Sequence, residues 1–302
     1  MLPFARVTII GLGLIGSSIA RGVRAGMPGV ALSGYDADPE VRETARALAL
    51  VDDVADTPGA ALIDADLVIL CVPVGAIGAV AAEIAADLPA DAILSDVGSC
   101  KASVVEALQA ALPAATIVPA HPVAGTERSG PEAGFAALFH KRWCILTPPE
   151  GTPAVAVERV AEFWRRLGAD IDIMAPDHHD RVLAVTSHLP HLIAYTIVGT
   201  ASDLEEVTSS EVIKYSAGGF RDFTRIAASD PTMWRDVFLS NREAVLDMLQ
   251  RFSEDLSELQ RAIRWGKGDQ LFDTFTRTRA VRRSIIEQGQ DDARPDFGRG
   301  DH

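Results

Sequence analysis

The sequence predicts an α/β domain followed by an all-helical domain, and two observations support this prediction. From residue 6 to about residue 174, short apolar runs suited to buried strands alternate with helical stretches, which is typical of a mostly parallel sheet covered by helices on both faces. After Pro176, apolar residues recur at three- and four-residue steps, and no further strand-like run is flanked by turn signals. We therefore expect domains over residues 1–175 and 176–289 and a disordered tail over residues 290–302.

A glycine pattern opens the first domain. The apolar run from Val7 to Ile10 predicts a buried strand, and the loop that follows it consists of Gly11, Leu12, Gly13, Leu14, Ile15 and Gly16. In a dinucleotide-binding loop of this spacing, the first glycine makes the tight turn and the second lets the backbone approach a pyrophosphate at a helix N-terminus. The third lets the helix pack closely on the sheet. The pattern therefore predicts a Rossmann-type nucleotide-binding domain.

An acidic residue after the second predicted strand indicates which dinucleotide binds. The strand is the apolar run from Val30 to Gly34, and Asp36 lies 20 residues beyond Gly16. An aspartate at this place accepts hydrogen bonds from the ribose hydroxyls of NAD and repels the additional phosphate of NADP. The sequence therefore predicts NAD as the cofactor and disfavours NADP.

The remaining elements of the first domain continue the alternation. Further strands are expected at Leu67–Val72, Ile93–Asp96, Thr116–Pro119, Trp143–Leu146 and Asp170–Ile173, and helices at Ala76–Asp87, Ser99–Ala111 and Ala154–Leu167. In a dinucleotide fold, the turn after the strand that begins at Leu67 lies beside the adenosine and the pyrophosphate. We therefore expect Val72, in this turn, to contact the cofactor.

Long helices are expected in the second domain at about Asp180–Ala201, Trp234–Ile263 and Asp269–Gln288. The first is apolar nearly all round, so it must be buried on every side. A second subunit or the core of a single chain would satisfy this requirement equally. Pro190 lacks a backbone donor and should kink this helix.

Composition excludes several classes of function. The net charge of −14 and the isoelectric point near 4.9 argue against a nucleic-acid partner. No apolar run reaches the ~18 residues needed to span a bilayer, and no signal peptide precedes the first strand, so we expect a cytoplasmic protein without a membrane partner.

Three widely spaced cysteines indicate reduced thiols. The triplet His178-His179-Asp180 suggests a metal site, but Asp177 resembles a helix N-cap and no third ligand converges, so no metal is expected.

Polar residues with catalytic potential stand after two predicted strands and in the helical domain. An open α/β sheet forms its site beyond the carboxyl ends of its strands, with a second domain as the lid, so these segments are expected to meet. The residues are Ser99 in the first segment, His121, Thr126 and Glu127 in the second, and His188, His191 and Arg225 in the third. Helix capping alone would explain Ser99, and a satisfied core position would explain either histidine of the third segment.

The motifs that hold these residues resemble, in this order, those of the prephenate and arogenate dehydrogenases of tyrosine biosynthesis. They are Gly-Leu-Gly-Leu-Ile-Gly-Ser-Ser from Gly11, Asp-Val-Gly-Ser-Cys-Lys from Asp96, His-Pro-Val-Ala-Gly-Thr-Glu from His121, Ser-His-Leu-Pro-His from Ser187, and Gly-Gly-Phe-Arg-Asp-Phe-Thr-Arg from Gly218 with Met-Trp-Arg-Asp from Met233. The resemblance spans about residues 6–265. It implies an α/β Rossmann-type nucleotide-binding domain followed by an all-α helical dimerisation domain, and therefore a homodimer.

The resemblance also implies a role for each residue. His121 is expected to be the catalytic histidine, with Ser99 beside it near the nicotinamide, where it fixes the ring of His121 or contacts the substrate hydroxyl. Arg225 is expected to bind a substrate carboxylate. The residues expected to line the same pocket are His191, Thr126 and Glu127.

The implied reaction is the oxidative decarboxylation of prephenate, and it accounts for these residue types. Hydride leaves C4 for the nicotinamide, CO2 leaves C1, and the ring becomes aromatic. A neutral His121 can accept a hydrogen bond from the C4 hydroxyl as positive charge grows there, so activity should fall in acid. Arg225 can hold a carboxylate bidentately, and we expect the pyruvyl carboxylate, because clamping the departing one would stabilise the ground state.

The sequence leaves three alternatives. A β-hydroxyacid dehydrogenase shares the two-domain plan but needs a lysine on the long helix of the second domain, and no lysine lies within residues 180–201. A non-catalytic NAD-binding sensor needs the nucleotide loop but not His121, Ser99 and Arg225 together. Prephenate and arogenate differ in a keto or an amino group, and Glu127 could attract the ammonium of arogenate or pair with an arginine, so the substrate stays open.

Overall fold

The computed structural model describes residues 2–126, 128–203 and 218–287. The chain forms two compact units, Met1–Val245 and Leu246–His302. The predicted disordered tail, residues 290–302, lies outside the described residues.

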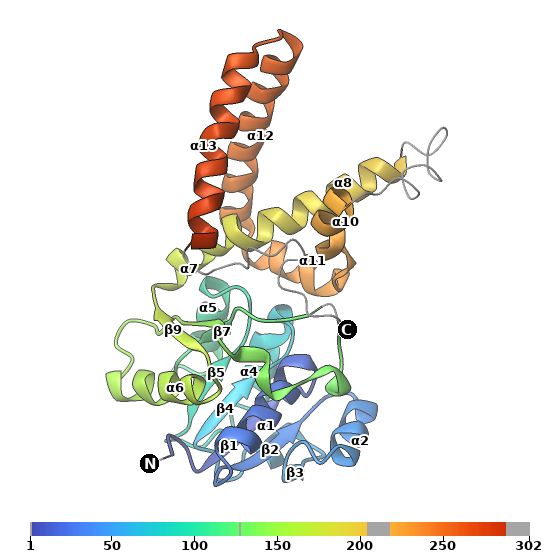
Figure 1. Cartoon of the computed structure of the whole chain (residues 1–302). Coiled ribbons are helices and arrows are strands. Elements are labelled where there is room, and N and C mark those ends of the chain that lie inside the picture. Colours follow the sequence, from blue (N-terminus) through green and yellow to red (C-terminus); the bar gives the residue numbers. More distant parts are fainter. Residues whose placement is uncertain (1, 127, 204–217, 288–302) are drawn as a thin grey trace. The chain divides into compact units, whose positions relative to one another are not determined.

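A six-stranded parallel sheet forms the centre of the first unit (Figure 1), and the strand order is β3-β2-β1-β4-β5-β6. The strands are β1 (Arg6–Ile10), β2 (Ala31–Tyr35), β3 (Asp53–Val54), β4 (Leu67–Leu70), β5 (Ile93–Asp96) and β6 (Thr116–Ile117). This order is that of dinucleotide-binding sheets, with β1 and β4 at the point where the order reverses. In the register, Ile10 pairs with Tyr35 and Leu70, and Leu70 pairs with Asp96, so the carboxyl ends of four strands lie at one edge.

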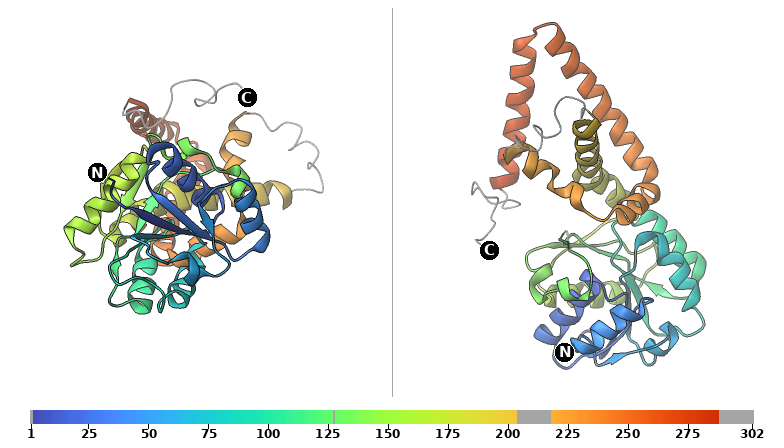
Figure 2. Two further views of the ribbon diagram at one scale, coloured as in Figure 1. Left: turned by 90° about the horizontal axis from the view of Figure 1, so that it is seen from below. Right: turned by 90° about the vertical axis from the view of Figure 1, so that its right-hand side faces the viewer.

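Helices cover both faces of this sheet, as the sequence predicted (Figure 2). They are α1 (Leu14–Gly26), α2 (Pro39–Ala47), α3 (Pro58–Ala61), α4 (Ile77–Glu83), α5 (Ala102–Ala111) and α6 (Ala154–Arg166). Successive side chains of a strand point to opposite faces. Ile9 accordingly packs in one core cluster with Trp164 of α6, whereas Ile10 packs in the other with Leu108 of α5.

A second, three-stranded sheet is an unpredicted feature. It consists of β7 (Ala120–Pro122), β8 (Trp143–Leu146) and β9 (Asp170–Ile173), with β7 antiparallel to β8 and β8 parallel to β9. The sequence analysis placed the strands at Trp143 and Asp170 in the main sheet. The chain leaves that sheet at Pro119, which has no N–H to continue the ladder and whose carbonyl accepts from the Thr147 N–H at 2.9 Å. His121 therefore lies within a strand and not in a loop.

The long apolar helix of the second predicted domain is interrupted. It consists of α7 (Pro176–Leu183), a π-helical turn (Ala184–His188) and α8 (Leu189–Asp203). The π-helical turn lies just before Pro190, where a kink was expected, and in it the N–H of Leu189 bonds to the carbonyl of Ala184. Wider hydrogen-bonded turns of this kind accommodate a missing backbone donor.

This helix leaves much apolar surface uncovered in a single chain. Val185, Ile197 and Val198 are 50%, 40% and 39% exposed, so the expected burial on every side is not met within the described residues. By length and composition, the helix Pro176–Asp203 could cross a membrane, against our expectation that no segment would qualify. One such helix is weak evidence for a membrane span, because the core helix of a globular protein passes the same test.

The remaining described helices are α10 (Gly218–Thr224), a 3-10 turn η5 (Arg225–Ala228), α11 (Pro231–Ser240), α12 (Arg242–Arg264) and α13 (Gly268–Glu287). The single helix predicted over Trp234–Ile263 is wrong, because the helix ends at Ser240 and a new one begins at Arg242. The break is at Asn241, whose buried side chain donates to the carbonyl of Asp180 at 2.8 Å. In the second unit, α12 and α13 form a helical hairpin (Figure 1).

Candidate active site

The nucleotide loop lies between β1 and α1, and its glycines have different surroundings. Gly11 has a φ of +98°, and a Cβ there would lie 2.5 Å from the carbonyl oxygen of Cys71. A Cβ on Gly16 would lie 2.0 Å from the carbonyl oxygen of Gly11. A Cβ on Gly13, at the N-cap of α1, would meet no heavy atom within 4 Å. The loop therefore has no space for a side chain at Gly11 and Gly16, where backbone packs on backbone, but it has free space at Gly13, at the helix N-terminus. This arrangement fits a dinucleotide pyrophosphate.

Asp36 lies directly beside this loop. Its Oδ2 accepts from the Leu12 N–H at 2.7 Å, and its Oδ1 accepts from the Asp38 N–H at 3.0 Å. Because β1 pairs with both β2 and β4, Asp36 and Val72 follow strands on either side of the loop. The carboxylate is thus held by backbone at the sheet edge where ribose binds in this fold.

His121 is the first of three buried side chains in direct contact. Its Nδ1 lies 2.8 Å from Nε2 of His179, and Nδ1 of His179 lies 2.8 Å from Oδ1 of Asp180. His121 comes from β7, whereas His179 and Asp180 come from α7. We refer to His121, His179 and Asp180 as the histidine–aspartate cluster. Within the described residues, His179 and not Ser99 contacts Nδ1 of His121.

Asp180 also caps α5. Its Oδ1 accepts from the Lys101 N–H at 2.8 Å, and its Oδ2 accepts from the Ala102 N–H at 3.0 Å. The interpretation of Ser99 as the N-cap is therefore wrong, because α5 begins at Ala102 and a carboxylate distant in sequence serves its free N–H groups. The interpretation of Asp177 as an N-cap is also wrong, because the N-cap of α7 is Ala175.

A buried ion pair between Lys101 and Asp96 lies next to the backbone that precedes His121. Nζ of Lys101 contacts Oδ2 of Asp96 at 2.5 Å and donates to the carbonyl of Ala120 at 2.8 Å, and both charged side chains have no exposed surface. Asp96 ends β5 and Ala120 precedes His121, so this lysine ties β7 to the carboxyl end of β5. Ligands bind at this edge of a parallel sheet. Burial raises the pKa of Asp96, and the charge of Lys101 opposes this shift.

The electrostatic surroundings keep the cluster in one protonation state. Burial lowers the pKa of His121 well below its usual value, and electrostatic interactions with His179, Lys101 and His188 lower it further. Burial also lowers the pKa of His179, against the hydrogen bond to Asp180. Burial would raise the pKa of Asp180, but hydrogen bonds from His179 and from two backbone N–H groups lower it on balance. Near neutral pH both imidazoles are therefore neutral and Asp180 is ionised.

A second group of predicted residues lies in the helical part. The ring of His191 stacks on Trp234 at 3.7 Å between centroids, and its Nδ1 donates to the Ser187 carbonyl at 2.8 Å. Burial lowers the pKa of His191, and the positive charge of Arg225, on η5, adds to this shift. The structure therefore brings His191 and Arg225 within electrostatic range of each other.

The other predicted residues are less constrained. Thr126 is exposed, and its Oγ1 accepts from the Arg128 N–H at 3.2 Å. Ser99 is half-buried in the segment between β5 and α5. Glu127 lies outside the described residues. His188 is buried, with Nδ1 3.1 Å from Asn241 Nδ2.

The contacts of His179, Asp180 and Lys101 in this site were not predicted from the sequence. The triplet at residues 178–180 suggested only a metal ligand set. In the part of the chain that the structure describes, no group of three or more His, Cys, Asp or Glu side chains could hold a metal ion. A usable signal was present, because Asp180 follows two histidines on a helix that otherwise becomes apolar.

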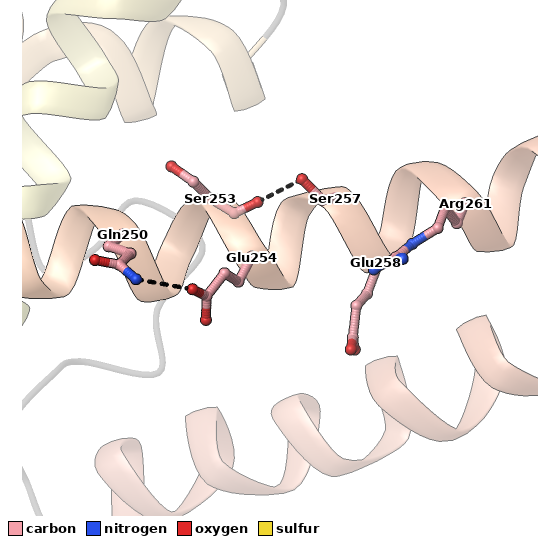
Figure 3. A pocket seen from close by; sticks show the side chains of 6 residues that line it. All are labelled: Gln250, Ser253, Glu254, Ser257, Glu258 and Arg261. Atoms are coloured by element: carbon pink, nitrogen blue, oxygen red, sulfur yellow. Dashed lines mark hydrogen bonds between the residues drawn. The ribbon is translucent and has the colours of Figure 1, made fainter.

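A hollow of about 430 Å³ lies along α12 in the second unit (Figure 3). It is lined by Gln250, Ser253, Glu254, Ser257, Glu258 and Arg261. All six side chains are exposed residues of one helix, and two pairs of them hydrogen-bond along that helix. None of the predicted site residues contributes to this hollow, so we do not assign the active site to it.

Two family models match the chain. The model of the prephenate dehydrogenase nucleotide-binding domain matches residues 19–173, and the model of the prephenate dehydrogenase dimerization domain matches residues 175–277. The chain is 48% identical over 285 residues to the cyclohexadienyl dehydrogenase of Zymomonas mobilis. This alignment covers 94% of this chain and 97% of that protein. It is 34% identical over 271 residues to the prephenate dehydrogenase of Bacillus subtilis, covering 89% of this chain and 73% of that protein.

Solved structures give the same result. The prephenate dehydrogenase from Aquifex aeolicus in complex with hydroxyphenyl propionate and NAD+ superposes with a TM-score of 0.87 at 33% identity, covering 94% of this chain and 98% of that chain. The Synechocystis arogenate dehydrogenase superposes with a TM-score of 0.79 at 26% identity, covering 93% and 99% of the two chains. The fold class predicted from the sequence is confirmed. The chain belongs to the prephenate dehydrogenase family.

Proposed function

We propose that this protein is an NAD-dependent dehydrogenase that converts prephenate to 4-hydroxyphenylpyruvate and CO2. The observation that carries this proposal is a buried, neutral imidazole, His121, tied through Lys101 to the carboxyl end of β5. This is the edge of the sheet at which a dinucleotide binds. Family membership supplies the class of reaction.

The proposed cofactor site consists of Gly11, Gly13, Leu14, Ile15, Gly16, Asp36 and Val72. The open space beside Gly13 and the backbone-held carboxylate of Asp36 fit NAD, and the carboxylate disfavours the additional phosphate of NADP. When bound, the nicotinamide supplies the hydride acceptor. The solved Aquifex relative contains NAD+, which supports the choice of cofactor.

In the proposed mechanism, Nε2 of His121 accepts a hydrogen bond from the C4 hydroxyl of the substrate as positive charge develops at C4. Ser99 is proposed to contact the same hydroxyl. The ring becomes aromatic as CO2 leaves C1, so the protein has mainly to position the substrate and to accept the developing charge. Only a neutral imidazole can accept here, so activity should decline as acid protonates His121.

Arg225, His191, Thr126 and Glu127 are the proposed substrate-binding residues. The charge of Arg225 suits a carboxylate, and we assign it to the pyruvyl end, because a firm contact with the departing carboxylate would oppose decarboxylation. Arg225→Ala should weaken the binding of 4-hydroxyphenylpyruvate, which lacks the ring carboxylate. Unchanged binding of this product, measured by calorimetry, would overturn the assignment.

We also propose a domain boundary near residue 175 and a homodimer. The match to a dimerization domain over residues 175–277 supports both proposals. The exposed apolar residues of α8 support the homodimer. Light scattering should give about twice the chain mass of 32.2 kDa. A monomer at micromolar concentration would contradict the proposal.

A cyclohexadienyl dehydrogenase that accepts both prephenate and arogenate is the second candidate function, because the Zymomonas relative at 48% identity has that name. NADH absorbance, followed with each substrate and with NAD or NADP, separates the two. Turnover of prephenate alone supports the first proposal, and turnover of both supports the second. No turnover of either substrate would favour a non-catalytic nucleotide-binding sensor.

A further inference from the structure

We propose that His179 and Asp180 are positioning residues that hold His121 in the tautomer with its proton on Nδ1, so that Nε2 is the proton acceptor of the ring. This inference rests on the proposed function, in which His121 acts on the substrate. It adds two residues that lie outside every motif that pointed to the family.

The direction of each hydrogen bond follows from the carboxylate. An ionised carboxylate can only accept, so the 2.8 Å contact with Asp180 Oδ1 requires a proton on Nδ1 of His179. A neutral imidazole has one ring proton, so Nε2 of His179 has a lone pair and accepts from Nδ1 of His121 at 2.8 Å. Nε2 of His121 is then left unprotonated. Asp180 therefore determines, two rings away, which nitrogen of His121 is basic.

The carboxylate itself is fixed in place. Its two oxygens accept the N–H groups of Lys101 and Ala102, at the N-terminus of α5, where a negative charge is favoured. The backbone carbonyl of Asp180 accepts from Nδ2 of Asn241. A carboxylate with both oxygens held, on a residue whose backbone is also held, cannot rotate to present a different oxygen to His179.

Nearby charged groups offer no other route to the same tautomer. Nζ of Lys101 contacts Asp96 and the Ala120 carbonyl. His188 contacts Asn241, and burial lowers its pKa to about 4, so it is neutral near pH 7. Within the described residues, none of these groups hydrogen-bonds to the ring of His121 or to that of His179.

The first arm of the test is kinetic. Asp180→Asn replaces an acceptor with an amide that can donate to Nδ1 of His179, which favours the wrong tautomer of both rings. The equivalent change in serine proteases lowers kcat by about 10⁴-fold. We expect a loss of kcat of about 100-fold or more, with the KM for NAD changed by less than about threefold.

Substitutions of His179 add a conservative comparison. His179→Leu removes the acceptor for Nδ1 of His121 and should lower kcat as Asp180→Asn does. In His179→Gln, the amide oxygen can still accept from that nitrogen, so this variant should retain more activity than His179→Leu. The matched control is His178→Gln, which changes an exposed neighbour on the same helix and should leave kcat unchanged.

The second arm measures the tautomers without any turnover. In the wild-type protein labelled with 15N-histidine, the ring resonances of His121 and His179 should show a protonated Nδ1 and an unprotonated Nε2. Their assignment comes from His121→Gln and His179→Gln spectra. Asp180→Asn should move His121 toward the form protonated on Nε2.

Each outcome supports or overturns the inference. A proton on Nε2 of His121 in the wild type, or wild-type kcat in Asp180→Asn, overturns it. If the variants fail to fold, the wild-type spectrum decides alone, with assignment from distance-dependent couplings to neighbouring protons. If the expected tautomers are present but neither prephenate nor arogenate is turned over, the proposed function fails and the tautomer assignment stands.

Discussion

The nucleotide loop and the histidine–aspartate cluster lie at the same edge of the sheet and are built in opposite ways. The loop is shaped by close backbone contacts at Gly11 and Gly16, and beside Gly13 it is open. The cluster consists of side chains from two elements, is closed, and has hydrogen bonds that select one protonation state. In the proposed function, cofactor binding depends on open space beside a backbone turn, whereas proton chemistry depends on a network that exists before any ligand arrives. Mutations should therefore separate the two.

Removal of the His121 imidazole should give the largest effect. General acid–base groups contribute about 10²–10⁴-fold to rate, so His121→Ala should lower kcat by a factor in this range. The affinity for NAD, measured by calorimetry, should stay within about threefold of wild type, because the loop does not depend on this ring. A loss of NAD binding as large as the loss of kcat would show that the two regions are not separable. His178→Ala serves as the control.

The ion pair beneath the cluster should give the next largest effect, and it concerns stability. Lys101→Met leaves Asp96 buried without its partner, and breaking a buried pair in this way costs about 3–5 kcal/mol. We expect a corresponding fall in the free energy of unfolding in urea. Asp56→Asn is the matched control, because it removes an ion pair with Arg46 in which Asp56 is 85% exposed, and it should have no measurable effect. Equal effects of the two variants would contradict this account.

The contrast between the two regions also explains how far the sequence could be interpreted. The strand, turn and helix start of the loop were predicted correctly because one short segment contains all three, and each glycine acts locally. The cluster was missed because His121 and His179 lie 58 residues apart, and nothing local in either segment indicates the other. The second sheet and the break at Asn241 were missed for the same reason. The three residues of β7 are too few to show a period, and β8 and β9, though predicted as strands, do not indicate which sheet they join. Asn241 is held by Asp180, which is 61 residues away.

Alanine substitutions at two glycines of the loop should separate protein stability from the affinity for NAD. Gly16→Ala brings a Cβ to 2.0 Å from the carbonyl of Gly11, and the resulting shift of backbone should cost about 1–3 kcal/mol of stability despite the better helix propensity of alanine. Gly13→Ala meets no atom within 4 Å, so the melting temperature of the free protein should stay the same. Its affinity for NAD should fall by about tenfold or more, because the methyl group occupies the space proposed for the pyrophosphate. Equal melting temperatures of the two variants would show that the close contact at Gly16 is absent.

The dependence of stability on pH belongs to the buried histidines and not to the loop. The pKa values of His121, His179 and His188 are lowered in the folded protein, that of His188 to about 4, against 6.5 when exposed. As the pH falls below about 6.5, the unfolded chain binds protons that the folded protein does not, so the free energy of unfolding decreases. Asp96 acts in the opposite direction, because burial raises its pKa and the folded protein binds that proton more strongly.

Urea titrations between pH 7 and pH 4.5 measure this slope, because the interval includes the ordinary histidine pKa of 6.5 and stays above the pKa of about 4 for His188. His179→Gln removes one of the three groups and should reduce the slope by as much as one proton. Gly13→Ala and His178→Gln should retain the wild-type slope, because neither changes a buried titratable side chain. If His179→Gln also retains the wild-type slope, His179 is protonated equally in the folded and unfolded states. The assignment of a neutral His179 would then be wrong. The separation of cofactor binding from proton chemistry depends on that assignment.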